Sequence, residues 1–199
     1  MSKPIIAVDI DEVLLPHFQD LMTWHNVTYG TSLTLADNGS KDISKWGAAS
    51  YEDAIRRVHA FFKDEMFLSQ QPFGEARQVL GWLDSCYDLV IVTARDTIIE
   101  AVTRDWLDEH FADLFKGVHF TAQYNLEGKS RTKAEALHEI GASYLIDDSP
   151  SNILPALEAG LWCVLFGDYP WNQLEPLPEG VVRCKDWDAV KEYFDGITG

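Results

Sequence analysis

The chain has 199 residues, of which 46% are hydrophobic and 12% aromatic, so it can bury one sizeable core and does not have the composition of a disordered protein. Its formal net charge of −16 argues against a nucleic-acid duplex as partner, because the protein would repel the phosphates of the duplex. A small phosphorylated ligand remains compatible with this charge, since one divalent cation and a local lysine or arginine can reverse the sign of a pocket.

Three cysteines, Cys86, Cys163 and Cys184, lie far apart and form no CxxC pair, as expected for reduced thiols in the cytoplasm. Cys86 and Cys163 stand in apolar surroundings, which predicts that both are buried. No stretch approaches the roughly 18 apolar residues that a membrane span needs, and the start MSKPIIAVDIDE reaches acidic residues too early for a signal peptide. We therefore expect a cytoplasmic protein without a membrane partner, and the sequence leaves open whether it forms a homodimer.

Short apolar runs alternate with helix-like segments along the chain, which is typical of an α/β fold with a parallel sheet. The five expected strands are 5–8, 89–93, 118–121, 144–146 and 161–166. The expected helices around this sheet are 73–85, 97–110, 133–140, 153–159 and 187–194.

The interval from residue 15 to residue 72 contains no convincing strand and two helical stretches, 16–26 and 51–66. The second stretch follows Ser50, a residue type that favours the N-cap position. Because a structureless connection of this length would be unusual in a compact domain, we predict a small helical cap inserted after the first strand, the helical lobe (residues 15–72). Residues 1–14 and 73–199 would then form the core domain.

Polar residues follow several of these elements at the edge of the sheet where open parallel sheets bind ligands, beyond the carboxyl ends of the strands. They are Asp9-Ile10-Asp11 after the first strand, Thr93-Ala94-Arg95 after the second, Lys133 at the start of a helix and Asp147-Asp148 after the fourth strand. No cluster is specific alone, but their order and position together predict one site.

Phosphoryl transfer requires an in-line nucleophile, neutralisation of the phosphoryl oxygens and a proton donor for the leaving oxygen. Asp9 ends its strand and is predicted as the nucleophile, which would form an aspartyl-phosphate. Asp11 points the same way two residues further along an extended chain, so we predict that it protonates the leaving oxygen and later activates water.

The clustered carboxylates would repel one another unless a cation lies among them. Asp148, with Asp147 behind it, completes with Asp9 a set of hard oxygen ligands suited to Mg²⁺. Thr93 and Lys133 are predicted to offer a hydroxyl group and a positive charge to the transferring oxygens. Simpler interpretations remain open, in which Asp147 and Asp148 only cap a helix, Thr93 is an ordinary strand residue and Lys133 is a surface lysine.

Taken together, DIDEV, IVTAR, Lys133 and LIDDSPSNI resemble the four motifs of the haloacid dehalogenase (HAD) superfamily of phosphotransferases, from residue 5 to about residue 170. The resemblance implies a Rossmann-like parallel sheet with helices on both faces, an obligatory Mg²⁺ and the roles given above. It also implies that the main-chain carbonyl of Asp11 binds the metal, that Asp148 is a direct ligand and that Asp147 lies in the outer shell. The helical lobe resembles the first cap type of the superfamily.

Within the superfamily, the short cap, LIDDSP and LFGDYPWN are most similar to the 5′(3′)-deoxyribonucleotidase group, which implies a nucleoside monophosphate as substrate. Two departures from the pattern of this group matter. Glu12 stands where glycine is usual and places a third acid beside the site, and His17-Phe18 replace the usual Asp-Phe, so base recognition cannot be carried over.

The spacing from Lys133 to Asp147 is long for the superfamily, which leaves Lys129 and Arg131 as alternatives for the phosphate contact. Further substrate contacts are predicted for Ala94, Arg95, His17, Phe18 and Trp46. The alternative for Arg95 is an ion pair within its turn, and the alternative for the aromatic residues is packing inside the helical lobe.

We therefore predict a Mg²⁺-dependent phosphomonoester hydrolase, a 5′(3′)-(deoxy)nucleotidase that releases phosphate from nucleoside monophosphates. Two alternatives remain: a phosphatase for another small metabolite such as a phosphosugar, and a catalytically weak protein that only binds a phosphorylated ligand.

Overall fold

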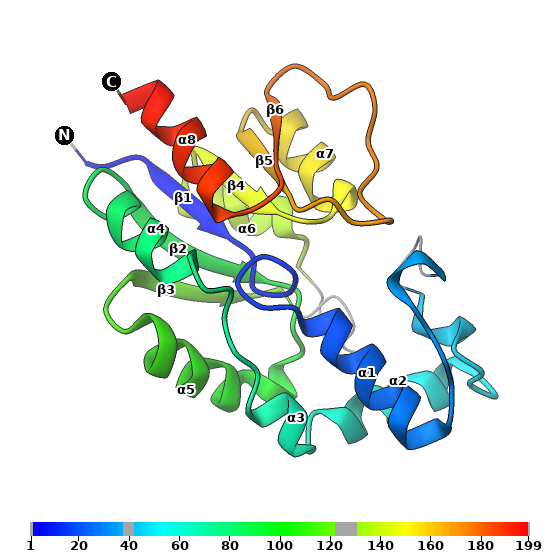
Figure 1. Ribbon diagram of the computed structural model, residues 1–199. Helices are drawn as coiled ribbons and strands as arrows, with labels where there is room; N and C mark the ends of the chain where they lie inside the picture. The colour runs from blue at the N-terminus through cyan, green and yellow to red at the C-terminus, as the bar shows by residue number, and fades with distance from the viewer. Residues whose placement is uncertain (1, 38–41, 122–130, 199) are drawn as a thin grey trace.

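The computed structural model describes residues 2–37, 42–121 and 131–198, and six strands in this part of the chain form one sheet in the order β3-β2-β1-β4-β5-β6 (Figure 1). Every neighbouring pair of strands is parallel. The strands are β1 (Ile5–Val8), β2 (Asp88–Thr93), β3 (Phe115–Phe120), β4 (Tyr144–Asp147), β5 (Trp162–Phe166) and β6 (Val181–Cys184). The predicted parallel α/β fold is confirmed.

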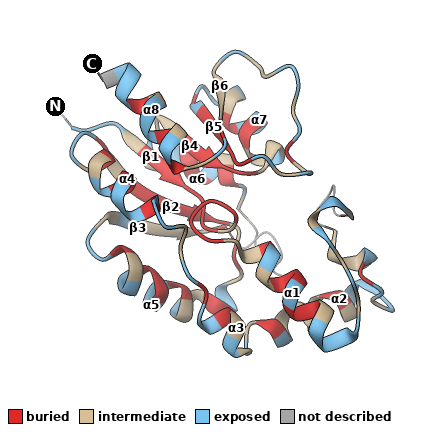
Figure 2. Cartoon of the chain, in the orientation of Figure 1, coloured by how far each residue is buried: buried red, intermediate tan, exposed pale blue. Residues whose placement is uncertain are grey.

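Helices cover both faces of the sheet. The helices are α1 (His17–Tyr29), α2 (Tyr51–Phe61), α3 (Glu65–Leu68), α4 (Ala76–Leu83), α5 (Glu100–Phe111), α6 (Lys133–Ile140), α7 (Pro150–Glu158) and α8 (Trp187–Thr198). Ile6 and Val8 of β1 point into one apolar cluster with α4, α5 and α8, whereas Ala7 points into the opposite cluster with α6 and α7, as the alternation of side chains along a strand requires. Figure 2 shows the central strands buried between these two layers. The described residues also form three short 3-10 helices: η1 (Leu35–Asp37), η2 (Ile43–Lys45) and η3 (Thr97–Ile99).

The bounds of β1 and α6 agree with the sequence prediction residue for residue, and two other elements differ for identifiable reasons. The single helix expected over 51–66 is two helices, because the side chain of Asp64 accepts a hydrogen bond from the backbone N–H of Met66 and starts α3 anew. Helix α7 begins at Pro150, three residues before the predicted start, since proline is well suited to the first turn of a helix.

Two sequence predictions were wrong outside the site. Strand β6 was not expected, because it is short and mostly half-buried. Its sequence therefore contains no long apolar run that would predict a strand. Cys86 was expected to be buried but is exposed, whereas Cys163 and Cys184 are buried. No described helix is long and apolar enough to cross a bilayer.

Helices α1, α2 and α3 gather beyond the carboxyl end of β1, away from the layers that cover the sheet (Figure 1). They hold an apolar cluster of their own, to which Ile99 of η3 also contributes. Its buried members are Phe18, Leu21, Met22, Trp24, Trp46, Phe61, Phe67 and Ile99. Burial of these apolar side chains holds the helical lobe in place over the end of the sheet.

Candidate active site

The candidate site lies at the point where the sheet reverses its strand order. Strand β1 pairs with β2 on one side and with β4 on the other, so the loops after β1 and β4 leave in different directions and open a crevice between them. Asp9 follows β1, Asp147 ends β4 and Asp148 follows it. One carboxylate oxygen of each residue lies within 4.8 Å of the other two, and all three residues are buried. The predicted convergence of these acids is therefore present.

Asp9 is held by the backbone and by one cation. Its Oδ1 accepts a hydrogen bond from the backbone N–H of Ile10 at 2.8 Å, and its Oδ2 lies 2.7 Å from Nζ of Lys133. Burial raises the pKa of Asp9 to about 7, because desolvation disfavours the carboxylate; the charge of Lys133 opposes the shift, and the neighbouring Asp147, Asp11 and Asp148 add to it. An additional cation beside Asp9 would favour its ionised form.

Lys133 is the first residue of α6, and a capping box fixes this start. The hydroxyl of Thr132 accepts a hydrogen bond from the backbone N–H of Glu135, while the carboxylate of Glu135 accepts one from the backbone N–H of Thr132. The side chain of Lys133 is 2% exposed, and its Nζ lies 2.7 Å from both Asp9 Oδ2 and Asp147 Oδ2. Burial lowers the pKa of Lys133, but the charges of Asp147 and Asp9 outweigh this and raise it, so the ammonium form is held.

Of the two described alternatives for the phosphate contact, Lys133 lies beside Asp9 and Asp147 and Arg131 does not. Arg131 instead pairs with Glu139 at 2.5 Å on the outer side of α6. Lys129, the other alternative, lies outside the described residues.

Asp147 is saturated with hydrogen-bond donors from this chain. Its Oδ1 accepts from the backbone N–H of Ser149 at 2.8 Å and from Nδ2 of Asn152 at 3.1 Å. Its Oδ2 accepts from Lys133 and from the same Asn152 amide at 3.1 Å. Asp147 therefore holds the loop after β4 and the lysine in place, while Ser149, not an aspartate, occupies the N-cap position of α7.

The carboxylate oxygens at this site are suitable ligands for a hard divalent cation. Asp9 and Asp148 offer carboxylate oxygens, which Mg²⁺ prefers, and Asp148 also accepts a hydrogen bond at Oδ2 from Nε1 of Trp171 at 2.6 Å. Three buried carboxylates against the one buried lysine of the described cluster leave an excess of negative charge, which a divalent cation would offset.

Asp11 lies at the edge of the site, with its side chain 25% exposed, and is clamped by an arginine. Nη2 and Nε of Arg95 lie 2.7 Å and 3.0 Å from Oδ1 of Asp11, and Nη1 of Arg95 donates to the hydroxyl of Thr103 at 3.2 Å. Nδ1 of His17 lies 3.6 Å from the same Asp11 oxygen. Arg95 was predicted to contact the substrate; in this structure it holds Asp11 instead, and its substrate contact stays a prediction.

Thr93 ends β2 and is fully buried, and its hydroxyl accepts a hydrogen bond from the backbone N–H of Arg95 at 3.2 Å. This bond shapes the turn that brings Ala94 and Arg95 to the wall of the cavity beside the acids. The alternative for Arg95 was an ion pair within its turn, where Asp96 is the neighbouring acid. Asp96 instead caps η3, because its carboxylate accepts a hydrogen bond from the backbone N–H of Ile98 at 3.0 Å.

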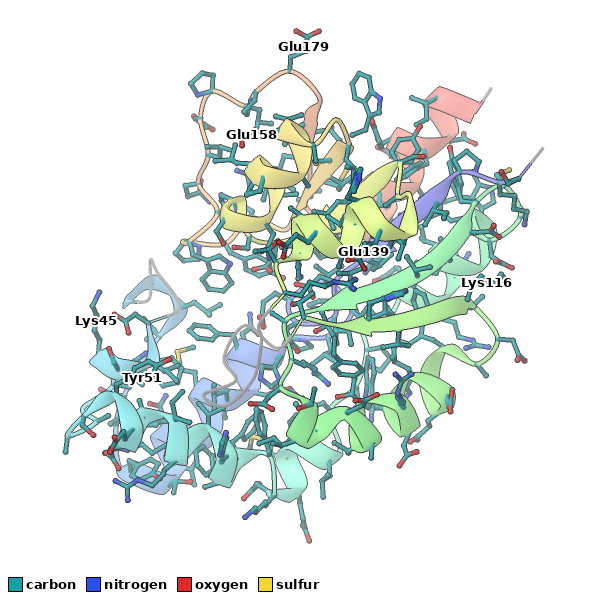
Figure 3. All side chains as sticks on the ribbon, turned by 180° about the vertical axis from the view of Figure 1, so that it is seen from behind. Lys45, Tyr51, Lys116, Glu139, Glu158 and Glu179 are labelled. Atoms are coloured by element: carbon teal, nitrogen blue, oxygen red, sulfur yellow. The ribbon has the colours of Figure 1, made fainter. Side chains whose placement is uncertain are left out.

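A cavity of about 460 Å³ opens between the acids and the helical lobe. Asp9, Asp11 and Asp148 line the cavity beside the sheet, together with the turn after β2 and the start of α7. Residues of α1 and α2 line it on the side of the helical lobe, including Tyr51, which Figure 3 shows on that lobe. The residues that line it from these two helices are His17, Phe18, Leu21, Tyr51, Ile55, Val58, His59 and Phe62. Two of the three aromatic residues predicted to contact substrate, His17 and Phe18, therefore face the cavity.

Trp46, the third of these, is buried inside the helical lobe and packs against Phe18 with ring centroids 5.1 Å apart. It is not one of the described residues that line the cavity. Packing within the lobe accounts for its position, and a direct substrate contact stays a prediction.

The structure brings to the site two further residues to which the sequence assigned no catalytic, metal-binding or substrate-binding role. Glu12 is buried at a positive φ of 64°, and its carboxylate accepts a hydrogen bond from the backbone N–H of Phe18 in the first turn of α1. Trp171 lies within LFGDYPWN, and its indole N–H contacts Asp148. The sequence did offer a signal for Glu12, because an acid stands there at a position where glycine is usual. No sequence pattern predicted the contact of Trp171 with Asp148.

Comparison with known proteins gives a consistent result. The profile of the family described as 5′ nucleotidase, deoxy (pyrimidine), cytosolic type C protein matches residues 3–194. The candidate nucleotidase YqfW of Bacillus subtilis is 25% identical over 193 residues, which cover 96% of this chain and 93% of that protein. A candidate 5′(3′)-deoxyribonucleotidase of Chlorobaculum tepidum is 25% identical over 211 residues, covering 100% of this chain and 94% of that protein.

Solved structures resemble the fold. The HAD-like hydrolase SP0104 of Streptococcus pneumoniae superposes with a TM-score of 0.71 at 19% identity, covering 96% of this chain and 98% of that chain. The candidate HAD hydrolase YfnB of Bacillus subtilis, whose structure is described as bound to magnesium, gives a TM-score of 0.64 at 13% identity over 98% of this chain and 100% of that chain.

Proposed function

We propose that this chain, which belongs to the 5′ nucleotidase, deoxy (pyrimidine), cytosolic type C family of HAD phosphatases, releases phosphate from nucleoside monophosphates through a covalent phospho-Asp9 intermediate. The observation that carries the proposal is the placement of Asp9: a buried carboxylate at the end of a central strand, paired with a lysine and open to the cavity. A carboxylate in this position can attack phosphorus directly, since its approach is fixed by the strand.

The proposed reaction has two steps. An oxygen of Asp9 attacks phosphorus, the bond from phosphorus to the nucleoside oxygen breaks, and protonated Asp11 donates its proton to that leaving oxygen. The Asp11 carboxylate then takes a proton from a water molecule, which attacks phosphorus and breaks the bond to Asp9, so that inorganic phosphate leaves. Lys133 and Thr93 are proposed to stabilise the charge on the transferring oxygens.

Asp9, Asp148 and the main-chain carbonyl of Asp11 would hold Mg²⁺. The ion supplies positive charge against the phosphoryl oxygens. Asp147 supports this site by holding Lys133, in agreement with an outer-shell role.

The cavity supports a nucleotide as the substrate. It is acidic at one end, where a cation would turn it into a phosphate site, and aromatic and aliphatic along the helical lobe, where a base and sugar could bury apolar surface. Its volume falls in the range of small-ligand pockets, roughly 300–1,000 Å³. We propose that the helical lobe (15–72) is a cap domain on a core formed by residues 1–14 and 73–199. A cytoplasmic location is proposed from the family description and from the wide spacing of the three free cysteines.

A panel of phosphate esters tests the proposed function. The protein is incubated with Mg²⁺ and with 5′ and 3′ nucleoside monophosphates of the ribose and deoxyribose series, alongside sugar phosphates, and released phosphate is measured. We expect the highest kcat/KM for nucleoside monophosphates. Equal rates throughout the panel, or faster release from sugar phosphates, would reject the nucleotide as substrate, and release from no ester would favour a protein that only binds phosphorylated ligands.

Asp11→Asn separates binding from turnover. An amide cannot donate the proton to the leaving oxygen or take one from water, so we expect kcat to fall by roughly 10²- to 10⁴-fold. Phosphate and Mg²⁺, measured by calorimetry, should still bind, because Asn keeps the side-chain oxygen that faces Arg95. Turnover equal to that of the wild-type protein would exclude Asp11 as the acid.

A further inference from the structure

The loop that follows β5 presents its aromatic residues to the site on a rigid support. Asn172 is buried within this loop: Nδ2 donates to the carbonyl of Phe166 at 2.8 Å, and Oδ1 accepts from the backbone N–H of Tyr169 at 3.0 Å and from Nη1 of Arg183 at 3.0 Å. At Gly167, φ is +81° and a Cβ would lie 2.1 Å from the ring of Tyr169, so only glycine allows this close turn. The position of Trp171 within the loop is therefore well defined.

Three directed contacts join Trp171 to other described residues. Its indole N–H donates to Oδ2 of Asp148 at 2.6 Å. Its ring stacks on that of Tyr169 with centroids 4.7 Å apart and planes at 9°, and it meets Phe18 of α1 edge-on at 5.3 Å. One side chain thus touches a proposed metal ligand, its own loop and the helical lobe.

The contacts close a ring through three segments of the chain, and Asp148 in a fourth segment is attached to this ring through Trp171. The hydroxyl of Tyr169 donates to the backbone carbonyl of Glu12 at 2.9 Å, and the carboxylate of Glu12 accepts from the backbone N–H of Phe18. Phe18 then returns to Trp171. The loops after β1, β4 and β5 and the first turn of α1 are therefore connected at this point, and the link that reaches the metal site is the indole N–H.

We infer that Trp171 is a positioning residue that orients the Asp148 carboxylate for Mg²⁺. Through its contact with Phe18, it also links this orientation to the position of the first turn of α1 in the helical lobe. This rests on the Mg²⁺ site of the proposed function. A carboxylate with one oxygen bonded to a fixed donor has lost its rotational freedom, so the group need not be ordered again when the metal binds. Hydrogen bonds from such outer residues commonly change metal affinity by about 10- to 100-fold.

Trp171→Phe removes the N–H but keeps an aromatic ring against Tyr169 and Phe18. We expect its Kd for Mg²⁺, measured by calorimetry without substrate, to rise about tenfold or more. A role in packing alone would leave this Kd unchanged, because the ring remains. Tyr169→Phe is the matched control: it removes one hydrogen bond from the same stack without touching Asp148, and its Kd should stay close to that of the wild-type protein.

A second measurement uses the unaltered protein and holds even if Trp171→Phe does not fold. The assigned indole N–H resonance of Trp171 is followed by NMR as Mg²⁺ is added, and we expect it to shift because its acceptor carboxylate becomes a metal ligand. An unshifted resonance, or a wild-type Kd in folded Trp171→Phe, would overturn the inference alone. A wild-type protein that does not bind Mg²⁺ would overturn the metal site of the proposed function and the inference with it.

Discussion

Asp9→Asn is expected to lower kcat for phosphate release by roughly 10⁴-fold or more, since an amide oxygen is a far weaker nucleophile than a carboxylate. The side chain keeps its size and its contact with the backbone N–H of Ile10, so the loss would report on chemistry and not on a rearranged loop. The measurement is released phosphate under saturating substrate and Mg²⁺. A second readout is the protein-bound phosphate that remains after acid quench, which should be present in the wild-type protein and absent from the variant.

The same variant should remain folded. Lys133 keeps Asp147 as its partner at 2.7 Å when Asp9 loses its charge, and one of three crowded, buried carboxylates is neutralised. We therefore expect the thermal midpoint of Asp9→Asn, measured without Mg²⁺, to be no lower than that of the wild-type protein. An active variant that also carries trapped phosphate would show that the nucleophile is another group.

The convergence of the acids could be predicted because the carboxyl ends of parallel strands share one edge of the sheet. Asp9 follows β1 and Asp148 follows β4, and these two strands are neighbours, so the two acids lie close together. Lys133 could be placed because a helix start is a local feature, here the Thr132 and Glu135 capping box. The chemical roles given to these residues stay predictions.

The partners of the site residues could not be predicted, since they depend on loops whose paths no periodic pattern fixes. Asp11 and Arg95 are 84 residues apart in sequence, and their contact arises from the turn that Thr93 shapes after β2. The contact of Trp171 with Asp148 likewise depends on a turn at Gly167, which brings the indole back over the sheet. Long-range contacts of this kind are set by packing and not by propensity.

The most severe change in stability is expected for Lys133→Met. The methionine fills most of the space of the lysine but leaves Asp9 and Asp147 without the cation that both contact at 2.7 Å. Removal of one partner from a buried ion pair commonly costs about 3–5 kcal/mol, so we expect a loss of this size in the free energy of unfolding, measured by urea denaturation without Mg²⁺. Phosphate release should fall as well, since the positive charge beside Asp9 is lost.

Two comparisons make the result specific. Mg²⁺ should raise the unfolding midpoint of Lys133→Met more than that of the wild-type protein, because the ion brings positive charge to carboxylates that have lost theirs. Arg131→Met removes a cation two residues earlier whose pair with Glu139 is 35% and 60% exposed, and such a pair contributes less than about 1 kcal/mol. If Lys133→Met were as stable and as active as Arg131→Met, the acids at the end of β1 and β4 would have to be neutralised by another cation, and Lys129 would be the next residue to replace.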